Sequence, residues 1–219
     1  MTLAYIPDRI LDLQLIMDKF IKRYKNLLFV DVETTGLDPI NDRIIEIGIV
    51  KVDKDNNKST FSRLVNPGYK ISKEVRQLTG IKLKDLATAP LFDELLNDLL
   101  DYFKADLFIA HNAKFDFDFI SEELTRHNQE LLVSYVDTIK LAKHFYPNYL
   151  TYSLDSIIAR LKLTVGKRHR GLDDAEVLWQ LYHKLILDFG EEHVQNAIHK
   201  FVITPKRRRT GDKTQVSLF

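Results

Sequence analysis

The stretch LLFVDVETTG, Leu27 to Gly36, decides how the rest of this chain is organised. Its first four residues are apolar and partly β-branched, which predicts a buried strand. Side chains alternate across a strand, so Asp31 and Glu33 point to one side while Val30 and Val32 point into the opposite packing layer. A buried strand rarely ends in two charges, and this ending is the first indication of a functional site.

Two carboxylates at a buried strand end repel each other and lose hydration, so each raises the pKa of the other unless a cation lies between them. Oxygen ligands without sulfur suit magnesium or manganese. Thr34, Thr35 and Gly36 then form a turn whose backbone can approach a ligand closely. An acidic pair with this spacing is also common on half-exposed strands that bind no metal, so the pair alone leaves both interpretations open.

The composition is that of a globular protein. With 219 residues, 25.6 kDa, 45% hydrophobic and 29% charged residues, the chain suits one α/β domain with extensions. It contains no cysteine, which excludes disulfides and thiolate metal sites and agrees with the cytoplasmic location that we expect. Asp8, Asp12 and Asp18 are unlike a signal peptide, and no apolar run approaches membrane-spanning length, so we expect no membrane partner.

Residues 1–25 are predicted to form an N-terminal amphipathic helix, because apolar residues recur there at helical spacing: Ile10, Leu13, Met17, Phe20 and Tyr24. Packing of this helix on the main domain is the favoured interpretation, and a helix that binds a partner is the alternative. Residues 26–203 form the predicted main domain, and residues 204–219 are a predicted flexible basic tail.

The main domain is predicted to be α/β. The opening strand, 43–52 and 58–65 are joined by short polar turns, which predicts three antiparallel strands. Two further strands, 107–110 and 132–136, alternate with helices, and the predicted helices are 71–81, 91–103, 115–127, 137–145, 153–161, 172–187 and 191–201. In the second strand, alternation predicts that Ile45, Ile47 and Ile49 share one face and Ile44 the other. A mixed five-stranded sheet with helices on its faces follows.

A second group of acids follows the fourth strand, in IAHNAKFDFDF, Ile109 to Phe119. Asp116 falls in the first turn of the next helix, and loops beyond strand ends are where ligands bind in α/β sheets. A carboxylate in a first turn is also stabilised by the helix dipole without any ligand. Asp118 is the rival, but its position sends it to another side of the helix.

The third group lies in RHRGLDDAEVLWQLY, Arg168 to Tyr182, where Asp173 and Asp174 occupy another first helical turn. His169 precedes this helix. A histidine in such a loop is usually solvated, but beside carboxylate-bound metal it can take a proton from water. The run Gly166 to Arg168 predicts a mobile loop that would let the histidine move in when substrate arrives.

Together, FVDVETTG, AHNAKFD and HRGLDDA, in this order and at this spacing, resemble the motifs of the DnaQ-like (DEDDh) family of 3′–5′ exonucleases, which includes the proofreading epsilon subunit of bacterial DNA polymerase III. The resemblance covers roughly residues 26–189 and implies a ribonuclease-H-like fold. Gly171 departs from the family, which commonly has alanine there; we expect it to loosen the loop without removing chemistry.

The resemblance also implies roles for individual residues. Asp31, Glu33, Asp116 and Asp174 would hold two divalent ions, Mg²⁺ or Mn²⁺, and His169 would be the general base. The terminal nucleotide would be held by residues of the first motif and three other segments: Thr34, Thr35, Gly36, Leu37, Leu78, Thr79, Asn112 and Phe115.

The tail carries a second resemblance. Lys206, Arg207, Arg208, Arg209 and Lys213 face one acid, Asp212, and could contact phosphates non-specifically or keep the tail solvated. The last five residues, Gln215, Val216, Ser217, Leu218 and Phe219, resemble the peptide by which bacterial replication proteins bind the sliding clamp. A tail without function is the alternative.

The expected function is metal-dependent removal of nucleotides from single-stranded or frayed DNA 3′ ends, in proofreading or repair, with a sliding clamp and a DNA polymerase subunit as expected partners. The first alternative keeps this chemistry and acts on RNA ends or short oligoribonucleotides. The second is a non-catalytic module that tethers a polymerase or clamp, which the retention of all five catalytic residue types disfavours.

Overall fold

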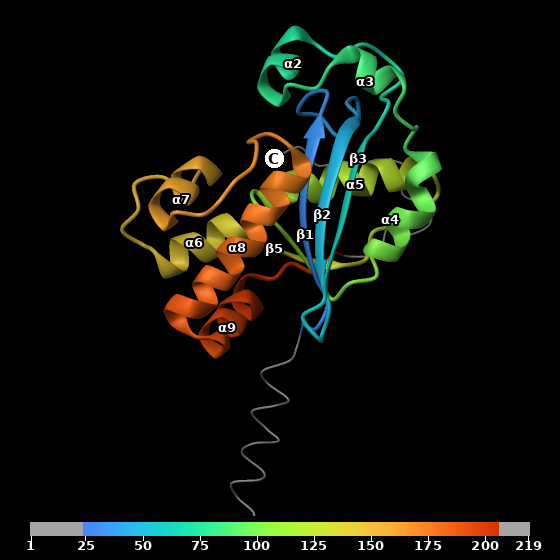
Figure 1. Cartoon of the computed structure of the whole chain (residues 1–219). Helices are drawn as coiled ribbons and strands as arrows, with labels where there is room; N and C mark the ends of the chain where they lie inside the picture. The colour runs from blue at the N-terminus through green and yellow to red at the C-terminus, as the bar shows by residue number, and fades with distance from the viewer. Residues whose placement is uncertain (1–23, 206–219) are drawn as a thin grey trace, which may run out of the picture.

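The structure, a computed structural model, describes residues 24–205. Within these residues a five-stranded sheet has the order β3-β2-β1-β4-β5 (Figure 1). The strands are β1 (Leu27–Thr34), β2 (Ile44–Val52), β3 (Lys58–Leu64), β4 (Leu107–Ala110) and β5 (Ser134–Asp137). β2 is antiparallel to both β1 and β3, whereas β4 runs parallel to β1 and β5 parallel to β4. The predicted mixed five-stranded α/β sheet, with three antiparallel strands followed by two that alternate with helices, is confirmed.

The helices agree with the predicted ones apart from their ends. They are α2 (Lys73–Thr79), α3 (Leu83–Ala87), α4 (Leu96–Tyr102) after the 3₁₀ turn η1 (Asp93–Leu95), α5 (Ala113–Arg126), α6 (Thr138–Phe145), α7 (Leu154–Leu161), α8 (Gly171–Phe189) and α9 (Glu191–Phe201). α3 was not predicted, because five residues are too few to show helical periodicity. β5 begins two residues later than expected, since Leu132 and Val133 lie before the paired segment.

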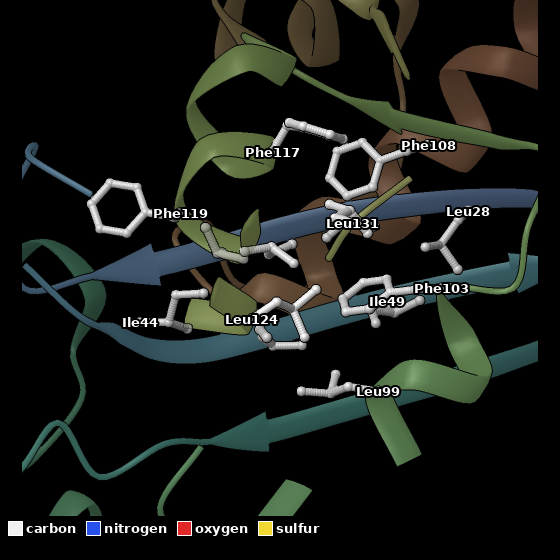
Figure 2. Close-up of a cluster of buried hydrophobic side chains, with 14 of the residues drawn as sticks. Leu28, Ile44, Ile49, Leu99, Phe103, Phe108, Phe117, Phe119, Leu124 and Leu131 are labelled. Atoms are coloured by element: carbon white, nitrogen blue, oxygen red, sulfur yellow. The ribbon is translucent and has the colours of Figure 1, made fainter. Parts of the chain in front are cut away.

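Strand alternation divides the core into two layers. Leu28, Val30 and Val32 of β1 join the cluster under η1, α4 and α5, part of which is shown in Figure 2. Leu27 and Phe29 join the cluster under α6, α7, α8 and α9. Asp31 and Glu33 continue the second series, so the strand carries both carboxylates toward the layer that contains α8.

The predicted faces of β2 were partly wrong. Ile44 packs in the same cluster as Ile47 and Ile49, whereas Ile45 packs in a separate cluster. The pairing of β1 with β2 shifts between Glu33 and Thr34, which leaves Ile45 as an extra residue on β2. Such an irregularity reverses the alternation on one side of it, and strict period-two counting cannot foresee where it falls.

Ile45 anchors a small cap at the end of the sheet that carries the acids. It packs against Ile71, Ile81 and Leu86, which belong to the segment around α2 and α3. Ser72 caps α2 by accepting a hydrogen bond from the Val75 backbone N–H at 3.2 Å, and Gly80 ends it with a left-handed φ of 70°. Both capping residues fall within the predicted helical range 71–81. The cap places α2 above the ends of β1 and β2 (Figure 1).

Buried apolar side chains anchor α8 along its length, and at its first residue the helix backbone lies against the backbone of the sheet. Val177, Leu178, Leu181 and Leu185 are at most 1% exposed, and their burial contributes on the order of 10 kcal/mol. At the start of α8, a Cβ added to Gly48 would lie 1.8 Å from the carbonyl carbon of Gly171.

Gly171 therefore does not loosen a loop, contrary to the expectation from the sequence. It is the buried first residue of α8, and a Cβ there would lie 2.7 Å from the Gly48 nitrogen and 3.0 Å from the Asp31 carbonyl oxygen. The two glycines let the first turn of α8 lie directly against β1 and β2, which brings Asp174 to the strand that carries Asp31 and Glu33.

The terminal predictions lie largely outside the described residues. These are the helix predicted in residues 1–25, of which only 24 and 25 are described, and the tail from residue 206 onward, including the clamp-like peptide. Near the end of the described residues, Ile203 lies beside β5 and exchanges backbone hydrogen bonds of 2.8 and 2.9 Å with Tyr135. Among the described helices, none combines the length and apolar character needed to cross a membrane.

Candidate active site

Three elements deliver the four predicted acids to one end of the sheet. Asp31 and Glu33 lie in the last half of β1, Asp116 lies in the first turn of α5, and Asp174 lies in the first turn of α8. Glu33, Asp116 and Asp174 are 9%, 3% and 2% exposed. Asp118 instead faces outward and forms an ion pair with Lys114 on the same helix, so of the two acids in that turn it is Asp116 that joins the cluster.

Burial and mutual repulsion raise the pKa values of the acids in β1. Burial raises the pKa of Asp31 well above its usual range, and the nearby charges of Asp116, Asp174 and Glu33 raise it further. Burial, with the charges of Asp174 and Glu46, raises the pKa of Glu33 to about 7. Without a cation the Glu33 carboxyl is therefore partly protonated near neutral pH, and burial and neighbouring charges also disfavour the ionised form of Asp31.

Asp116 has one compensating contact. Burial raises its pKa, while the Val32 backbone N–H donates a hydrogen bond of 3.1 Å to its Oδ1 and opposes that rise. Val32 lies between Asp31 and Glu33 in β1, so this hydrogen bond also fixes the start of α5 against the strand. A helix residue is thereby locked to β1 across 84 positions of sequence.

Asp174 and His169 are joined through the backbone. The His169 N–H donates a hydrogen bond of 3.0 Å to Asp174 Oδ2, and His169 adopts a left-handed φ of 58°. This conformation is uncommon for a non-glycine residue and bends the loop before α8. Glu33, His169 and Asp174 can each offer one ligand atom within 4.8 Å of the others, so these three could hold a metal ion.

Asp31 and Asp116 lie outside that group of three, although their charges act on it. The whole set nevertheless fits a hard divalent cation, because its donors are carboxylates, which suit magnesium and manganese. Asp174 Oδ1 is buried, and its neighbour is the Arg168 guanidinium, with which it forms an ion pair. A buried anionic oxygen of this kind needs a cation beside it, so it is also suited to binding a metal ion.

Two arginines in the loop before α8 complete the electrostatics, and the sequence did not identify either. Arg168 forms ion pairs with Asp174 and with Asp155 of α7, the latter at 2.6 Å. Arg170 donates from Nε and Nη2 to the buried carboxylate of Glu46, at 2.9 and 2.8 Å. Glu46 is paired with Glu33 across β1 and β2, and the only sequence signal for it was a charged residue inside an otherwise apolar run. The two arginines therefore tie the loop before α8 to α7 and β2, although the sequence predicted this loop to be mobile.

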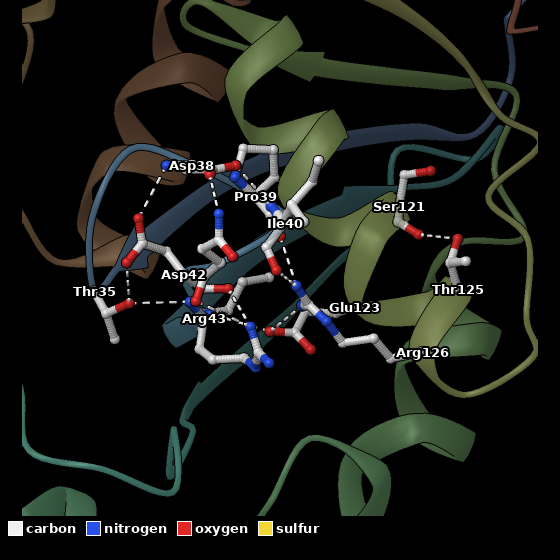
Figure 3. A network of polar contacts seen from close by, with 12 residues as sticks. Thr35, Asp38, Pro39, Ile40, Asp42, Arg43, Ser121, Glu123, Thr125 and Arg126 are labelled. Carbon is white, nitrogen blue, oxygen red and sulfur yellow. Dashed lines mark hydrogen bonds and ion pairs between the residues drawn. The ribbon is translucent and has the colours of Figure 1, made fainter. Parts of the chain in front are cut away.

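The turn after β1 is held rigidly. The Thr35 hydroxyl hydrogen-bonds Asp42 at 3.0 Å and Tyr69 at 2.8 Å, and it accepts from the Arg43 backbone N–H at 3.0 Å. Figure 3 shows how Arg126 of α5 reaches the same loop, where it donates to the carbonyl oxygens of Pro39 and Ile40, both at 2.7 Å. The Thr34 hydroxyl donates to the Gly36 carbonyl at 2.6 Å, which closes the turn.

The other predicted substrate residues differ in exposure. Leu37 and Leu78 are 85% and 57% exposed, and Asn112 is exposed at a left-handed φ of 64°. Phe115 is half-buried, with its ring 4.8 Å from that of Phe119. Thr79 is buried, and its hydroxyl donates to the Val75 carbonyl at 3.0 Å, so its side chain serves the end of α2.

Comparison with known proteins agrees with this architecture. A model of the RNase T family, described as Exonuclease, matches residues 28–182. The chain is 35% identical over 156 residues to the DNA polymerase III PolC-type of Caldanaerobacter subterraneus subsp. tengcongensis, an alignment that covers 71% of this chain and 11% of that protein. The chain thus spans about one ninth of the length of this relative.

Two solved structures share the fold. Exonuclease X in complex with 5′ overhanging duplex DNA matches with a TM-score of 0.63 and 25% identity, over 78% of this chain and 98% of that one. The nuclease domain of 3′hExo, a DEDDh family member bound to rAMP, matches with a TM-score of 0.67 and 20% identity, over 78% of this chain and 96% of that one. The ordered acidic motifs, the mixed sheet and these matches agree, and the chain belongs to the RNase T exonuclease family, of the DnaQ-like DEDDh type.

Proposed function

We propose that this protein is a metal-dependent exonuclease that removes nucleotides from DNA 3′ ends. The observation that carries the proposal is the gathering of Asp31, Glu33, Asp116 and Asp174 from three elements into one cluster, in which burial raises the pKa of all four and neighbouring carboxylates raise those of Asp31, Glu33 and Asp116 further. Such a cluster is costly for a fold unless a bound cation compensates it. The membership of the chain in an exonuclease family supplies the reaction class.

Asp31, Glu33, Asp116 and Asp174 would together hold two divalent cations, Mg²⁺ or Mn²⁺. Bound there, the cations would offset the negative charge that develops on the attacking and leaving oxygens of the phosphodiester. The protein's own contribution is a rigid frame. The bond from Val32 to Asp116 and the contact between Gly48 and Gly171 hold α5 and α8 against β1.

His169 is the proposed general base. A hydrogen bond from its backbone N–H to Asp174 holds it beside the acids, and its imidazole would accept a proton from the attacking water while the water oxygen forms its bond to phosphorus. The bond from phosphorus to the 3′ oxygen of the preceding nucleotide breaks, that oxygen takes a proton from solvent water to become a hydroxyl, and a nucleoside 5′-monophosphate leaves. A base of this kind contributes typically 10²–10⁴-fold to the rate.

The terminal nucleotide would lie against the turn after β1. Thr34, Thr35 and Gly36 form a turn closed by hydrogen bonds, and Leu37 projects from it with most of its surface exposed. Leu37 would wedge against the terminal base, and Leu78 in α2 is the second exposed apolar side chain proposed to contact it. Asn112 and Phe115 at the start of α5 complete the proposed contacts, and Thr79 would support them through the end of α2.

DNA is the preferred substrate in this proposal because the matched relative is a DNA polymerase. The same cluster would also hydrolyse RNA ends, and the fold is shared with a nuclease domain bound to rAMP. A non-catalytic tether is disfavoured because the acids and His169 are all retained and gathered. We further propose that the protein works in the cytoplasm with replication or repair enzymes, and that Gln215 to Phe219 bind a sliding clamp.

The deciding experiment compares 5′-labelled single strands of DNA and RNA, with magnesium and with chelator. We expect DNA to shorten from its 3′ end only with metal, Asp31→Ala to abolish the reaction and His169→Ala to slow it at least about 10²-fold. Faster loss of RNA than DNA would favour the oligoribonuclease alternative. Undiminished activity of Asp31→Ala would contradict the proposal.

A further inference from the structure

Arg168 is a cation inside a site that is built to hold other cations. Its guanidinium is mostly buried and forms ion pairs with Asp174 at the start of α8 and with Asp155 at the start of α7. Asp174 is 2% exposed, whereas the side chain of Asp155 is 65% exposed. The arginine thus has one partner deep in the acidic cluster and one partner at the surface.

The charge of Arg168 acts on most of the cluster. It lowers the pKa of Asp31, Glu33 and Asp174, in each case against the rise that burial causes. Arg170, two residues along, is committed to Glu46 through paired hydrogen bonds. Among the cations in the described part of the chain, Arg168 is therefore the one in direct ionic contact with a proposed metal ligand.

A divalent cation and Arg168 would compete for the same oxygen. Asp174 Oδ1 is buried and lies against the guanidinium, and a metal ion bound to Asp174 would carry two positive charges into that neighbourhood. Like charges a few ångströms apart repel even where water screens them. Binding the Arg168 guanidinium and a divalent metal ion to Asp174 at the same time would therefore cost free energy.

We propose that Arg168 is an internal counter-cation, which neutralises Asp174 while no metal is bound and is displaced when a divalent cation binds. Asp155 gives the displaced guanidinium a second partner, so it stays at the rim of the site. This proposal rests on the proposed metal-dependent function and assigns to Arg168 a role that the family motif does not contain. Its consequence is that Arg168 weakens metal binding and stabilises the metal-free fold.

The test measures Mn²⁺ binding by calorimetry and thermal unfolding in chelator, on the full chain. Arg168→Gln removes the competing charge, Arg168→Lys keeps the charge but loses the two-partner fork, and Lys167→Gln removes a charge from the neighbouring residue, whose ammonium lies beside Gly80 rather than on an acid of the cluster. The two charge-removing variants have the same net charge. A difference between them reports position rather than total charge.

We expect Arg168→Gln to bind Mn²⁺ about tenfold more tightly than wild type, since one unit charge near a dication contributes on that order. In chelator the same variant should unfold at a lower temperature than Lys167→Gln, and saturating Mn²⁺ should remove the difference. Arg168→Lys should resemble wild type in affinity, which also shows that the site is intact when position 168 is changed.

Equal Mn²⁺ affinity in Arg168→Gln, Lys167→Gln and wild type would overturn the counter-cation proposal while leaving the metal-dependent function standing. Weaker binding in Arg168→Gln with normal folding would overturn it as well, because it would make Arg168 a support for metal binding. Absence of Mn²⁺ binding to wild type would overturn the proposed function itself.

Discussion

Replacing Glu33 by glutamine should stabilise the metal-free protein. The pKa of Glu33 is raised from 4.5 to about 7 by burial and by the charges of Asp174 and Glu46. The unfolded chain releases this proton near pH 4.5, whereas the folded chain holds it until about pH 7. The folded state binds more protons between these values, so its stability falls as pH rises through this window and the full penalty is present above it.

The size of the effect follows from the shift. A change of about 2.5 pKa units corresponds to about 3 kcal/mol, and Glu33 is only 9% exposed, so solvent screens it little. For a chain of 219 residues this equals roughly 6–12 °C in the unfolding temperature. Asp31, Asp116 and Asp174 have pKa shifts of the same sign, so some pH dependence should remain in the variant.

The assay is urea unfolding in chelator at pH 5, 6, 7 and 8. Glu33→Gln should be close to wild type at pH 5 and more stable by about 3 kcal/mol at pH 8, while Glu192→Gln, exposed on α9, should match wild type throughout. Saturating magnesium should stabilise wild type more than the variant. A wild type whose stability does not fall between pH 5 and 8, or a variant no more stable at pH 8, would refute the account of a repulsive cluster.

Two further predictions concern packing and partners. Gly48→Ala should destabilise the fold by about 3 kcal/mol or more, since its Cβ would lie 1.8 Å from backbone atoms. Gly171→Ala should cost about 1–3 kcal/mol, since the closest contact of its Cβ would be 2.7 Å. Chemical denaturation measures both free energies of unfolding, and negligible losses in both variants would contradict the close contact. Replacing Leu218 and Phe219 by alanine should abolish binding to an immobilised sliding clamp but leave cleavage of free oligonucleotides unchanged. Clamp binding that survives the double replacement would remove the tail from the proposal.

Much of the fold follows from local pattern. The apolar run into Asp31 and Glu33, the alternation of later strands with amphipathic helices and the caps at Ser72 and Gly80 are short-range signals, so the mixed sheet and most helices were predictable. The small helix α3 and the extra residue Ile45 were not, because neither leaves a periodic trace over several turns.

The sequence by itself also determined which acids to expect together, since their order and spacing follow a family pattern. Only the tertiary structure decided what surrounds them. Arg168 beside Asp174 and Asp155, Arg170 beside Glu46, and the glycine contact that brings α8 to β1 join residues far apart in sequence or on separate elements. Such contacts depend on how layers pack in three dimensions, and neither periodicity along one element nor a local motif contains that information.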